Sequence, residues 1–169
     1  FNSEKQVKKF LRSQNIKLPI CYFHHQHQAH RFIYHDQQQL SESEPIWADS
    51  VLTEQRICLA MVVADCFPIL LVDQKIGAFA FIHGGWKPLV QNILELSVLD
   101  LKLQFSCSMD NLYAWIGPGI RSCCYQFSKK PFQAELPDWK KYISKTKDKD
   151  SGKENWKVNL PAFIKTEFN

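Results

Sequence analysis

The sequence predicts a folded protein built from both β-strands and α-helices. Of its 169 residues, 45% are apolar and 13% are aromatic, which is typical of a globular chain with a buried core. Short apolar runs that end at turn residues alternate with stretches in which apolar residues recur at helical spacing. The length fits a single domain over residues 1–169. Because the chain starts at Phe1 and stops just after an apolar stretch, we expect this domain to be incomplete at both ends.

Charge and hydropathy narrow the possible partners. Much of the net charge of +4 comes from residues 129–157, which are rich in both basic and acidic residues, a poor pattern for binding nucleic acid. No apolar run approaches the roughly 18 residues that a membrane-spanning helix needs. The six cysteines show neither C-x-x-C pairs nor the density of a secreted disulfide-bonded domain, so we expect a cytoplasmic protein. The sequence leaves the oligomeric state open between a monomer and a homodimer.

The first third of the chain predicts one helix and several strands. Val7, Phe10 and Leu11 recur at helical spacing and predict a helix that ends near Gln14. Strands are expected at residues 19–23, 31–34 and 57–63. Five of the six histidines fall between the first two of these strands or just after the second: His24, His25, His27, His30 and His35. For most of them we expect a solvated polar loop.

A β-hairpin is predicted next. The apolar runs 69–72 and 76–82 flank Asp73-Gln74-Lys75, which suits a turn between antiparallel strands. Such a hairpin would carry Cys66 and His83, which stand at its two outer ends, toward the same end of a sheet.

Further helices and strands follow the hairpin. Gly84-Gly85 interrupts the apolar run, and apolar residues at helical spacing predict a helix to about Leu103. We expect a strand at 112–116, an exposed helix and loop at 138–154, and the start of a helix at 160–168.

Cys66 and His83 suggest a metal site. Thiolate and imidazole are preferred ligands of zinc and copper, and three protein ligands leave a fourth position open for water. The third ligand would come from the histidine cluster, and His30 is the best candidate because it directly precedes a strand. Asp65, beside Cys66, could orient a histidine or act as an acid or base, so Asp65, Cys66 and His83 are the catalytic candidates. The competing interpretation of Cys66 is a buried core thiol.

Four ordered motifs resemble one family, the YfiH or laccase-domain family. They are Gln28-Ala29-His30, Ala64-Asp65-Cys66-Phe67-Pro68, His83-Gly84-Gly85-Trp86-Lys87, and Ile116-Gly117-Pro118-Gly119-Ile120 with Cys124-Tyr125. The family was first labelled multicopper polyphenol oxidase and is now described as purine nucleoside phosphorylase with adenosine deaminase and methylthioadenosine phosphorylase activity. The resemblance implies an α+β fold with a large mixed β-sheet and helices packed outside it. It also implies a metal site of two histidines and one cysteine, which maps onto His30, Cys66 and His83.

The resemblance implies a metal-dependent enzyme that acts on purine nucleosides. Its reactions would be phosphorolysis of adenosine, inosine or methylthioadenosine and deamination of adenosine, with Zn²⁺, or alternatively Cu²⁺, as cofactor. Purine nucleoside and phosphate would be its small-molecule partners. Lys87 and Arg121 are candidates for holding phosphate, and Trp86 and Tyr125 could stack on a purine.

Two other activities stay open on the sequence. A copper-dependent polyphenol oxidase would need histidines at several copper centres, more than one trio supplies. A metal-free hydrolase or amidase, acting on cell-wall peptides, could use Cys66 and His83 as a thiolate–imidazole dyad. A non-catalytic binding protein is the remaining alternative.

Overall fold

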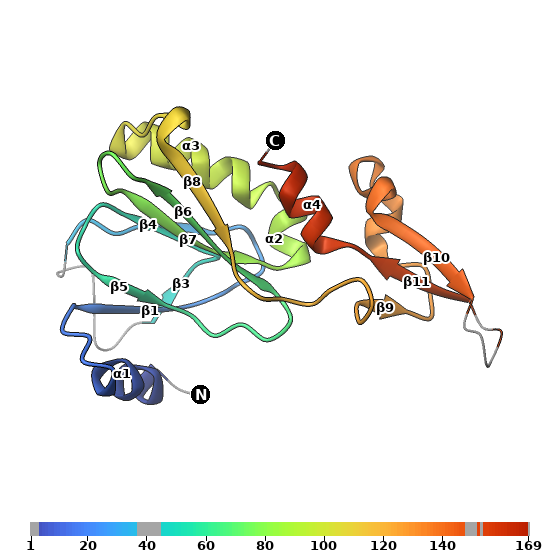
Figure 1. Ribbon diagram of the computed structural model, residues 1–169, viewed down its shortest axis with the longest axis horizontal. Coiled ribbons are helices and arrows are strands. Elements are labelled where there is room, and N and C mark those ends of the chain that lie inside the picture. Colours follow the sequence, from blue (N-terminus) through green and yellow to red (C-terminus); the bar gives the residue numbers. More distant parts are fainter. Residues whose placement is uncertain (1–3, 37–44, 148–151, 153, 169) are drawn as a thin grey trace. The chain divides into compact units, whose positions relative to one another are not determined.

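The computed structural model describes residues 4–36, 45–147, 152 and 154–168 (Figure 1). The chain divides into two compact units, Phe1–Gly117 and Pro118–Asn169, which are described in turn. The single domain expected from the length stays a prediction. No helix within the described residues combines the length and the apolar character needed to cross a bilayer.

The first unit is a mixed arrangement of sheets and helices. Its elements are α1 (Glu4–Ser13), β1 (Ile20–His24), β2 (Arg31–Ile33), β3 (Ile46–Trp47), β4 (Ser50–Thr53), β5 (Cys58–Ala60), β6 (Phe67–Asp73), β7 (Phe79–Gly84), α2 (Trp86–Val90), α3 (Ile93–Phe105), the 3₁₀ turn η2 (Met109–Asn111) and β8 (Leu112–Ile116). Five strands form one sheet in the order β2-β4-β7-β6-β8, in which β2 and β4 are parallel and the other pairs antiparallel. The α+β fold with a large mixed sheet is thus confirmed.

The predicted hairpin is confirmed as β6 and β7. Phe67 pairs with Gly84 and Pro68 with His83, so Cys66 and His83 do reach the same end of the sheet. The turn at the other end is held by Asp73, whose Oδ1 accepts hydrogen bonds from the main-chain N–H groups of Lys75 (2.9 Å) and Ile76 (3.2 Å).

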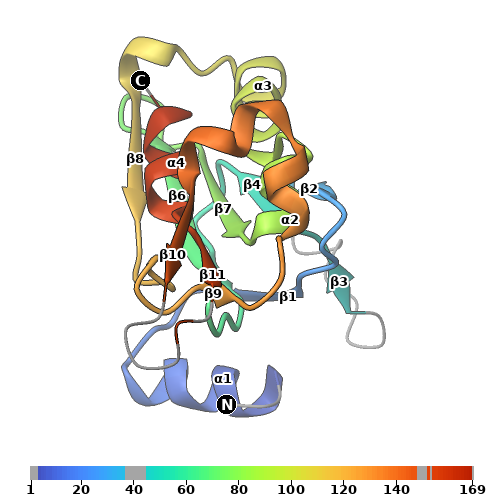
Figure 2. The ribbon, with the colours of Figure 1, turned by 90° about the vertical axis from the view of Figure 1, so that its right-hand side faces the viewer.

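The two faces of the five-stranded sheet are covered by different elements (Figures 1 and 2). Helix α3 packs on β4 and β7, where Ser97 Oγ donates to Ser50 Oγ at 2.9 Å in a fully buried pair. The opposite face meets a small parallel sheet ordered β3-β1-β5. Phe23 of β1 and Phe81 of β7 meet edge to face across this core, which also contains Cys21, Tyr34, Ala48, Val51 and Ile57.

Two elements differ from the prediction in this unit. The strand expected at 57–63 is only β5, and all three of its residues are half-buried. The single helix expected to end near Leu103 is divided into α2 and α3, because Asn92 adopts left-handed backbone with φ of 60°. That break leaves α2 as a short helix directly after the end of β7.

The second unit contains a separate antiparallel sheet. Its elements are β9 (Gln126–Phe127), the 3₁₀ turns η3 (Phe132–Glu135) and η4 (Pro137–Tyr142), β10 (Ile143–Lys147), β11 (Glu154–Val158) and α4 (Leu160–Thr166). The sheet order is β10-β11-β9. The exposed helix and loop predicted at 138–154 is therefore wrong for β10, whereas residues 138–142 do lie in the 3₁₀ helix η4. Lys145 faces Trp156 across the hairpin, with its ammonium 5.4 Å from the ring centre. The predicted final helix is confirmed as α4, whose Phe163 stacks on Trp139 at 4.0 Å.

Candidate metal centre

Three imidazole rings meet at the end of β7. His83 is near the end of that strand, and His25 and His27 come from the segment that follows β1 in the small sheet. Because the small sheet packs on the face of the large one, the ends of β1 and β7 are brought together. The ring centres of His25 and His83 are 4.3 Å apart and stacked, and that of His27 is 4.6 Å from His25 and 5.0 Å from His83. One nitrogen from each ring lies within 4.8 Å of the others, so the three rings could hold one metal ion.

His83 is fixed by a buried carboxylate. Its side chain is 1% exposed, and its Nδ1 lies 3.0 Å from Oδ1 of Asp49, which is fully buried. Burial alone would raise the pKa of Asp49, but hydrogen bonds from His83 and from the main chain at Gln28 and His27 outweigh it and lower the pKa to about 2. Asp49 is therefore ionised and can only accept, so the hydrogen of a neutral His83 ring is on Nδ1. Nε2 then carries a lone pair, and this buried atom has no hydrogen-bond partner among the described residues.

His25 offers a second nitrogen of the same kind. Its Nδ1 is buried and has no partner, while the ring forms a hydrogen bond with the backbone of Val62. Burial, followed by the neighbouring rings of His83 and His27, lowers the pKa of His25. A neutral imidazole with a free lone pair is the state that binds a metal. Two such nitrogens, both unpartnered, fit a metal ion in the donor set that zinc and copper prefer.

The backbone around His27 is unusual. His27 and Ala29 both have left-handed conformation, with φ of 61° and 53°, which costs energy for residues other than glycine. The N–H groups of His27 and Gln28 donate to the two oxygens of Asp49, each at 2.9 Å. Burial and His83 lower the pKa of the His27 imidazole, and the positive charge of Lys87 lowers it further.

Cys66 faces the same space as His83. A methyl group placed on Gly85 would lie 2.9 Å from Nε2 of His83 and 3.1 Å from Sγ of Cys66, so both atoms border the volume that Gly85 leaves free. Burial raises the pKa of the Cys66 thiol, and the charges of Asp65 and Asp49 raise it further. At neutral pH this cysteine is therefore a protonated thiol.

Not all of the site residues predicted from the sequence lie at this centre. Cys66 and His83 lie together, as the hairpin requires, but His30 has an exposed side chain and is not in the group of three imidazoles. Its carbonyl accepts hydrogen bonds from the N–H groups of Asp49 (2.7 Å) and Ser50 (3.0 Å). Asp65 is exposed, and the carboxylate that contacts His83 is Asp49. Sequence reasoning missed His25, His27 and Asp49 as members of one site. Asp49 carried a usable signal, since it is an acidic residue at the start of the short strand-like segment Ser50–Thr53.

The candidate substrate residues are divided between the two units. Trp86 and Lys87 begin α2, and the effect of Lys87 on His27 puts its charge near the centre. Gln91 connects α2 to the loop that carries His27, because its Nε2 donates to the carbonyls of His27 (3.2 Å) and Lys87 (3.0 Å). Arg121 and Tyr125 belong to the second unit, where the carbonyl of Arg121 accepts from the N–H of Tyr125 at 2.8 Å.

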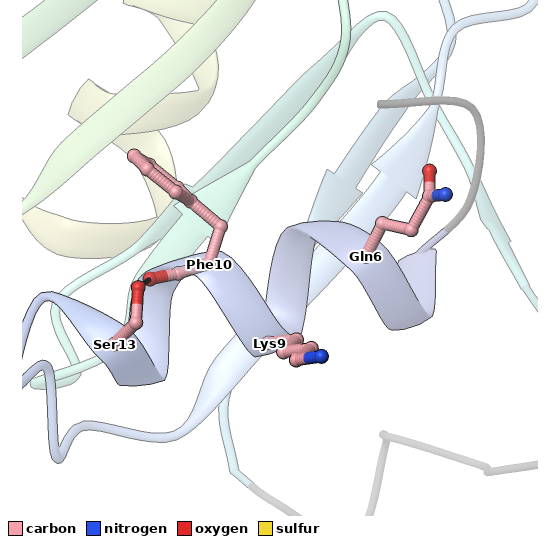
Figure 3. Close-up of a pocket in the computed structure, with 4 residues that line it drawn as sticks. All are labelled: Gln6, Lys9, Phe10 and Ser13. Atoms are coloured by element: carbon pink, nitrogen blue, oxygen red, sulfur yellow. Dashed lines mark hydrogen bonds between the residues drawn. The ribbon is translucent and has the colours of Figure 1, made fainter.

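A groove beside α1 is separate from these residues. It has a volume of about 420 Å³, and the described residues that line it are Gln6, Lys9, Phe10 and Ser13 (Figure 3). The Ser13 hydroxyl donates to the carbonyl of Phe10 at 2.6 Å, so it is occupied within the helix. These four side chains include no imidazole, thiol or carboxylate, and the groove offers no counterpart to the three-histidine centre.

The chain is similar to one protein family and to several named proteins. A family model described as multi-copper polyphenol oxidoreductase laccase matches residues 3–169. A purine nucleoside phosphorylase of Clostridium acetobutylicum is 31% identical over 91 residues, which are 53% of this chain and 39% of that protein. One from Aquifex aeolicus is 28% identical over 131 residues, 76% of this chain and 57% of that protein. A protein named adenosine deaminase, from an unknown prokaryotic organism, is 32% identical over 87 residues, 51% of this chain and 33% of that protein.

Two solved structures share the fold. The hypothetical protein YfiH of Bacillus licheniformis superposes with a TM-score of 0.72 at 20% identity, over 97% of this chain and 64% of that one. A Neisseria meningitidis protein gives a TM-score of 0.73 at 20% identity, over 98% of this chain and 66% of that one. The chain spans about two fifths of the length of the Clostridium relative and about two thirds of these structures.

Proposed function

The chain belongs to the family described as multi-copper polyphenol oxidoreductase laccases, and from this premise we propose that it forms part of a metal-dependent enzyme that acts on purine nucleosides. Its reactions would be phosphorolysis of adenosine, inosine or methylthioadenosine and deamination of adenosine. Relatives named purine nucleoside phosphorylase and adenosine deaminase support the substrate class.

The observation that carries the metal dependence is the pair of buried, unpartnered imidazole nitrogens. Nδ1 of His25 and Nε2 of His83 are both without a hydrogen-bond partner, and an unpaired buried polar atom is costly unless something binds it. With His27 they form a three-nitrogen donor set. Zinc is the ion we propose, with Cu²⁺ as the second candidate. When bound, zinc would supply Lewis acidity and lower the pKa of water toward about 7.

The chain's own residues would orient the other reactant. In phosphorolysis, a phosphate oxygen bonds to C1′ of the ribose, the bond from C1′ to the purine nitrogen breaks, and the purine takes up a proton as it leaves. Lys87, whose positive charge acts on His27, is positioned to attract phosphate. The protonated thiol of Cys66 borders the same space and could hold a proton there. Arg121 for phosphate, and Trp86 and Tyr125 for the purine, remain part of this proposal.

Two features oppose the alternative activities. Within the described residues, His25, His27 and His83 are the group that could hold a metal, which supplies fewer histidines than the several copper centres of a multicopper oxidase need. The raised pKa of Cys66 opposes a thiolate nucleophile, because only the deprotonated sulfur attacks.

Substrate turnover tests the proposal directly. The full chain, loaded with zinc, is incubated with adenosine and with inosine, with and without phosphate, and the products are separated by chromatography. Phosphate-dependent release of purine base, or phosphate-independent conversion of adenosine to inosine, is the expected result. His83→Ala should abolish turnover, whereas His30→Ala, which changes an exposed imidazole, should not. Turnover of neither nucleoside by zinc-loaded protein, or phenol oxidation by copper-loaded protein alone, would overturn it.

A further inference from the structure

We propose that Asp49 is the positioning residue of the three-histidine centre, because its single carboxylate holds both the ring of His83 and the turn that carries His27. A role of Asp49 in the enzyme's activity rests on the proposed metal-dependent function. Its geometric basis is the set of contacts that Asp49 makes.

Asp49 is a fully buried carboxylate, and all of its partners belong to the centre. Burying a charge is costly unless hydrogen bonds compensate it. Asp49 has three such donors, which are Nδ1–H of His83 at 3.0 Å and the N–H groups of His27 and Gln28, each at 2.9 Å. The carboxylate therefore connects the end of β7 to the loop after β1 that carries His27. These two segments are more than 50 residues apart in sequence (83 against 27).

The first consequence concerns the tautomer of His83. A neutral imidazole carries one hydrogen, and the acceptor next to one nitrogen decides where that hydrogen resides. Asp49 selects Nδ1, which leaves the lone pair on Nε2, the buried atom without a partner. Without this acceptor, Nε2 can carry the hydrogen and then cannot bind a metal.

The second consequence concerns the loop. His27 and Ala29 hold left-handed backbone, which persists only where surrounding contacts enforce it. The N–H groups of His27 and Gln28, which lie within this region, donate to Asp49, and the carbonyl of His30 in turn accepts a hydrogen bond from the N–H of Asp49 at 2.7 Å. Removing the carboxylate frees the loop to relax, and the ring of His27 moves away from His25 and His83.

Asp73 provides a matched control in the same unit. It is also buried, with 1% exposure, and also accepts main-chain hydrogen bonds, from Lys75, Ile76 and Ser108 at 2.9 to 3.2 Å. It ends β6 at the turn away from His83, and its hydrogen-bond partners within the described residues include no histidine. Asp73→Asn therefore removes a comparable buried charge without touching the centre.

The test compares Asp49→Asn with Asp73→Asn. Zinc affinity is measured by competition with a chromophoric chelator, and unfolding is followed by circular dichroism. Changing a group that orients a ligand typically costs 10–100-fold in metal affinity, so we expect about that loss for Asp49→Asn. Asp73→Asn should lower the melting temperature without changing zinc affinity. Unchanged affinity in Asp49→Asn, or equal losses in both variants, would overturn the inference.

A measurement on the unaltered, metal-free protein keeps the test independent of variant folding. Nitrogen-15 NMR of the His83 ring should show Nδ1 protonated and Nε2 bare, and the opposite tautomer would refute the role of Asp49. These readouts also separate the inference from the proposed function. Loss of zinc affinity in Asp49→Asn, in a protein that consumes no nucleoside, would leave the inference standing and the function rejected. Nucleoside turnover by the unaltered protein, together with unchanged zinc affinity in Asp49→Asn, would reject the inference and leave the proposed function standing.

Discussion

Replacing Gly85 with alanine should disable the centre by crowding it. Gly85 has extended backbone, with φ of −81° and ψ of 156°, which alanine adopts without strain. The change therefore adds one methyl group and little else. That methyl would lie 2.8 Å from Cε1 and 2.9 Å from Nε2 of His83, and 3.1 Å from Sγ of Cys66.

These distances set the expected size of the effect. Carbon atoms in contact prefer about 3.5–4.0 Å, so the His83 ring would have to move by about 0.6 Å or more, beyond the roughly 0.5 Å within which ligand groups must be held. We expect zinc affinity to fall by about 10–100-fold, as when a ligand loses its orientation, or about 1.4–2.7 kcal/mol. Overpacking should also cost about 1–3 kcal/mol of stability.

Chelator competition on folded protein measures the loss, and Gly84→Ala is the control. A methyl on Gly84 would lie 2.7 Å from Cδ1 of Ile69 and 2.7 Å from the carbonyl oxygen of Phe67, so it crowds the core without meeting the donor atoms. We expect Gly84→Ala to lower the melting temperature and leave the zinc affinity of the folded fraction unchanged. If Gly85→Ala binds zinc as tightly as the unaltered protein, the volume beside His83 is not part of the site.

Three further results are expected. His25→Ala should reduce the amount of bound zinc in elemental analysis, because it removes an unpartnered buried nitrogen. His30→Ala should retain its zinc, and equal zinc content in the two variants would exclude His25 as a ligand. The pKa values of His25 and His27 lie below the ordinary 6.5, so protons compete with zinc only at lower pH. Zinc affinity, measured as a function of pH, should stay constant down to about pH 6.5 and fall below it. A loss of zinc affinity above about pH 7 would contradict this expectation. Leu52→Ala, at a fully buried position, should cost about 2–5 kcal/mol in urea unfolding without altering zinc stoichiometry, and a cost under about 1 kcal/mol would show that the core there is not tightly packed.

The hairpin was predictable because local signals agree with the fold. The strand β6 is an apolar run that ends at Asp73, and Asp73 stands at the turn, where its carboxylate accepts main-chain hydrogen bonds. Short apolar runs and turn chemistry are signals that act over a few residues. They therefore sufficed to bring Cys66 and His83 together without knowledge of the rest of the chain.

The β10–β11 hairpin could not be found by the same route. Its strands carry lysines that would suit an exposed helix, and β10 contains only one aliphatic residue, Ile143. Pairing across the strands stabilises the hairpin instead, through Lys145, which contacts the Trp156 ring and forms an ion pair with Glu154 at 2.6 Å. Such cross-strand pairs contribute to a sheet only once the register exists, and sequence periodicity does not reveal the register.

Loop conformation decides which histidines gather around His83. His30 directly precedes β2, which made it the natural choice when spacing alone was available. The left-handed residues His27 and Ala29 turn the chain so that the rings of His25 and His27 reach His83, whereas the ring of His30 is not in this group. Non-glycine residues with this backbone are uncommon, and here they depend on hydrogen bonds to Asp49, 20 or more residues away in sequence. Neither fact can be derived from the order of histidines.

The state of Cys66 determines how this centre would bind a metal. A thiol must lose its proton to become a ligand, and burial together with the charges of Asp65 and Asp49 opposes that loss. Nε2 of His83 and Nδ1 of His25, in contrast, are unpartnered and need to release no proton from a neutral ring. The imidazoles would therefore hold the ion without releasing a proton, and the positive charge of the ion would counter the effect of the two carboxylates on the Cys66 thiol. Cys66 would then be a further donor whose binding requires the loss of one proton, whereas the imidazoles of His25 and His83 require none.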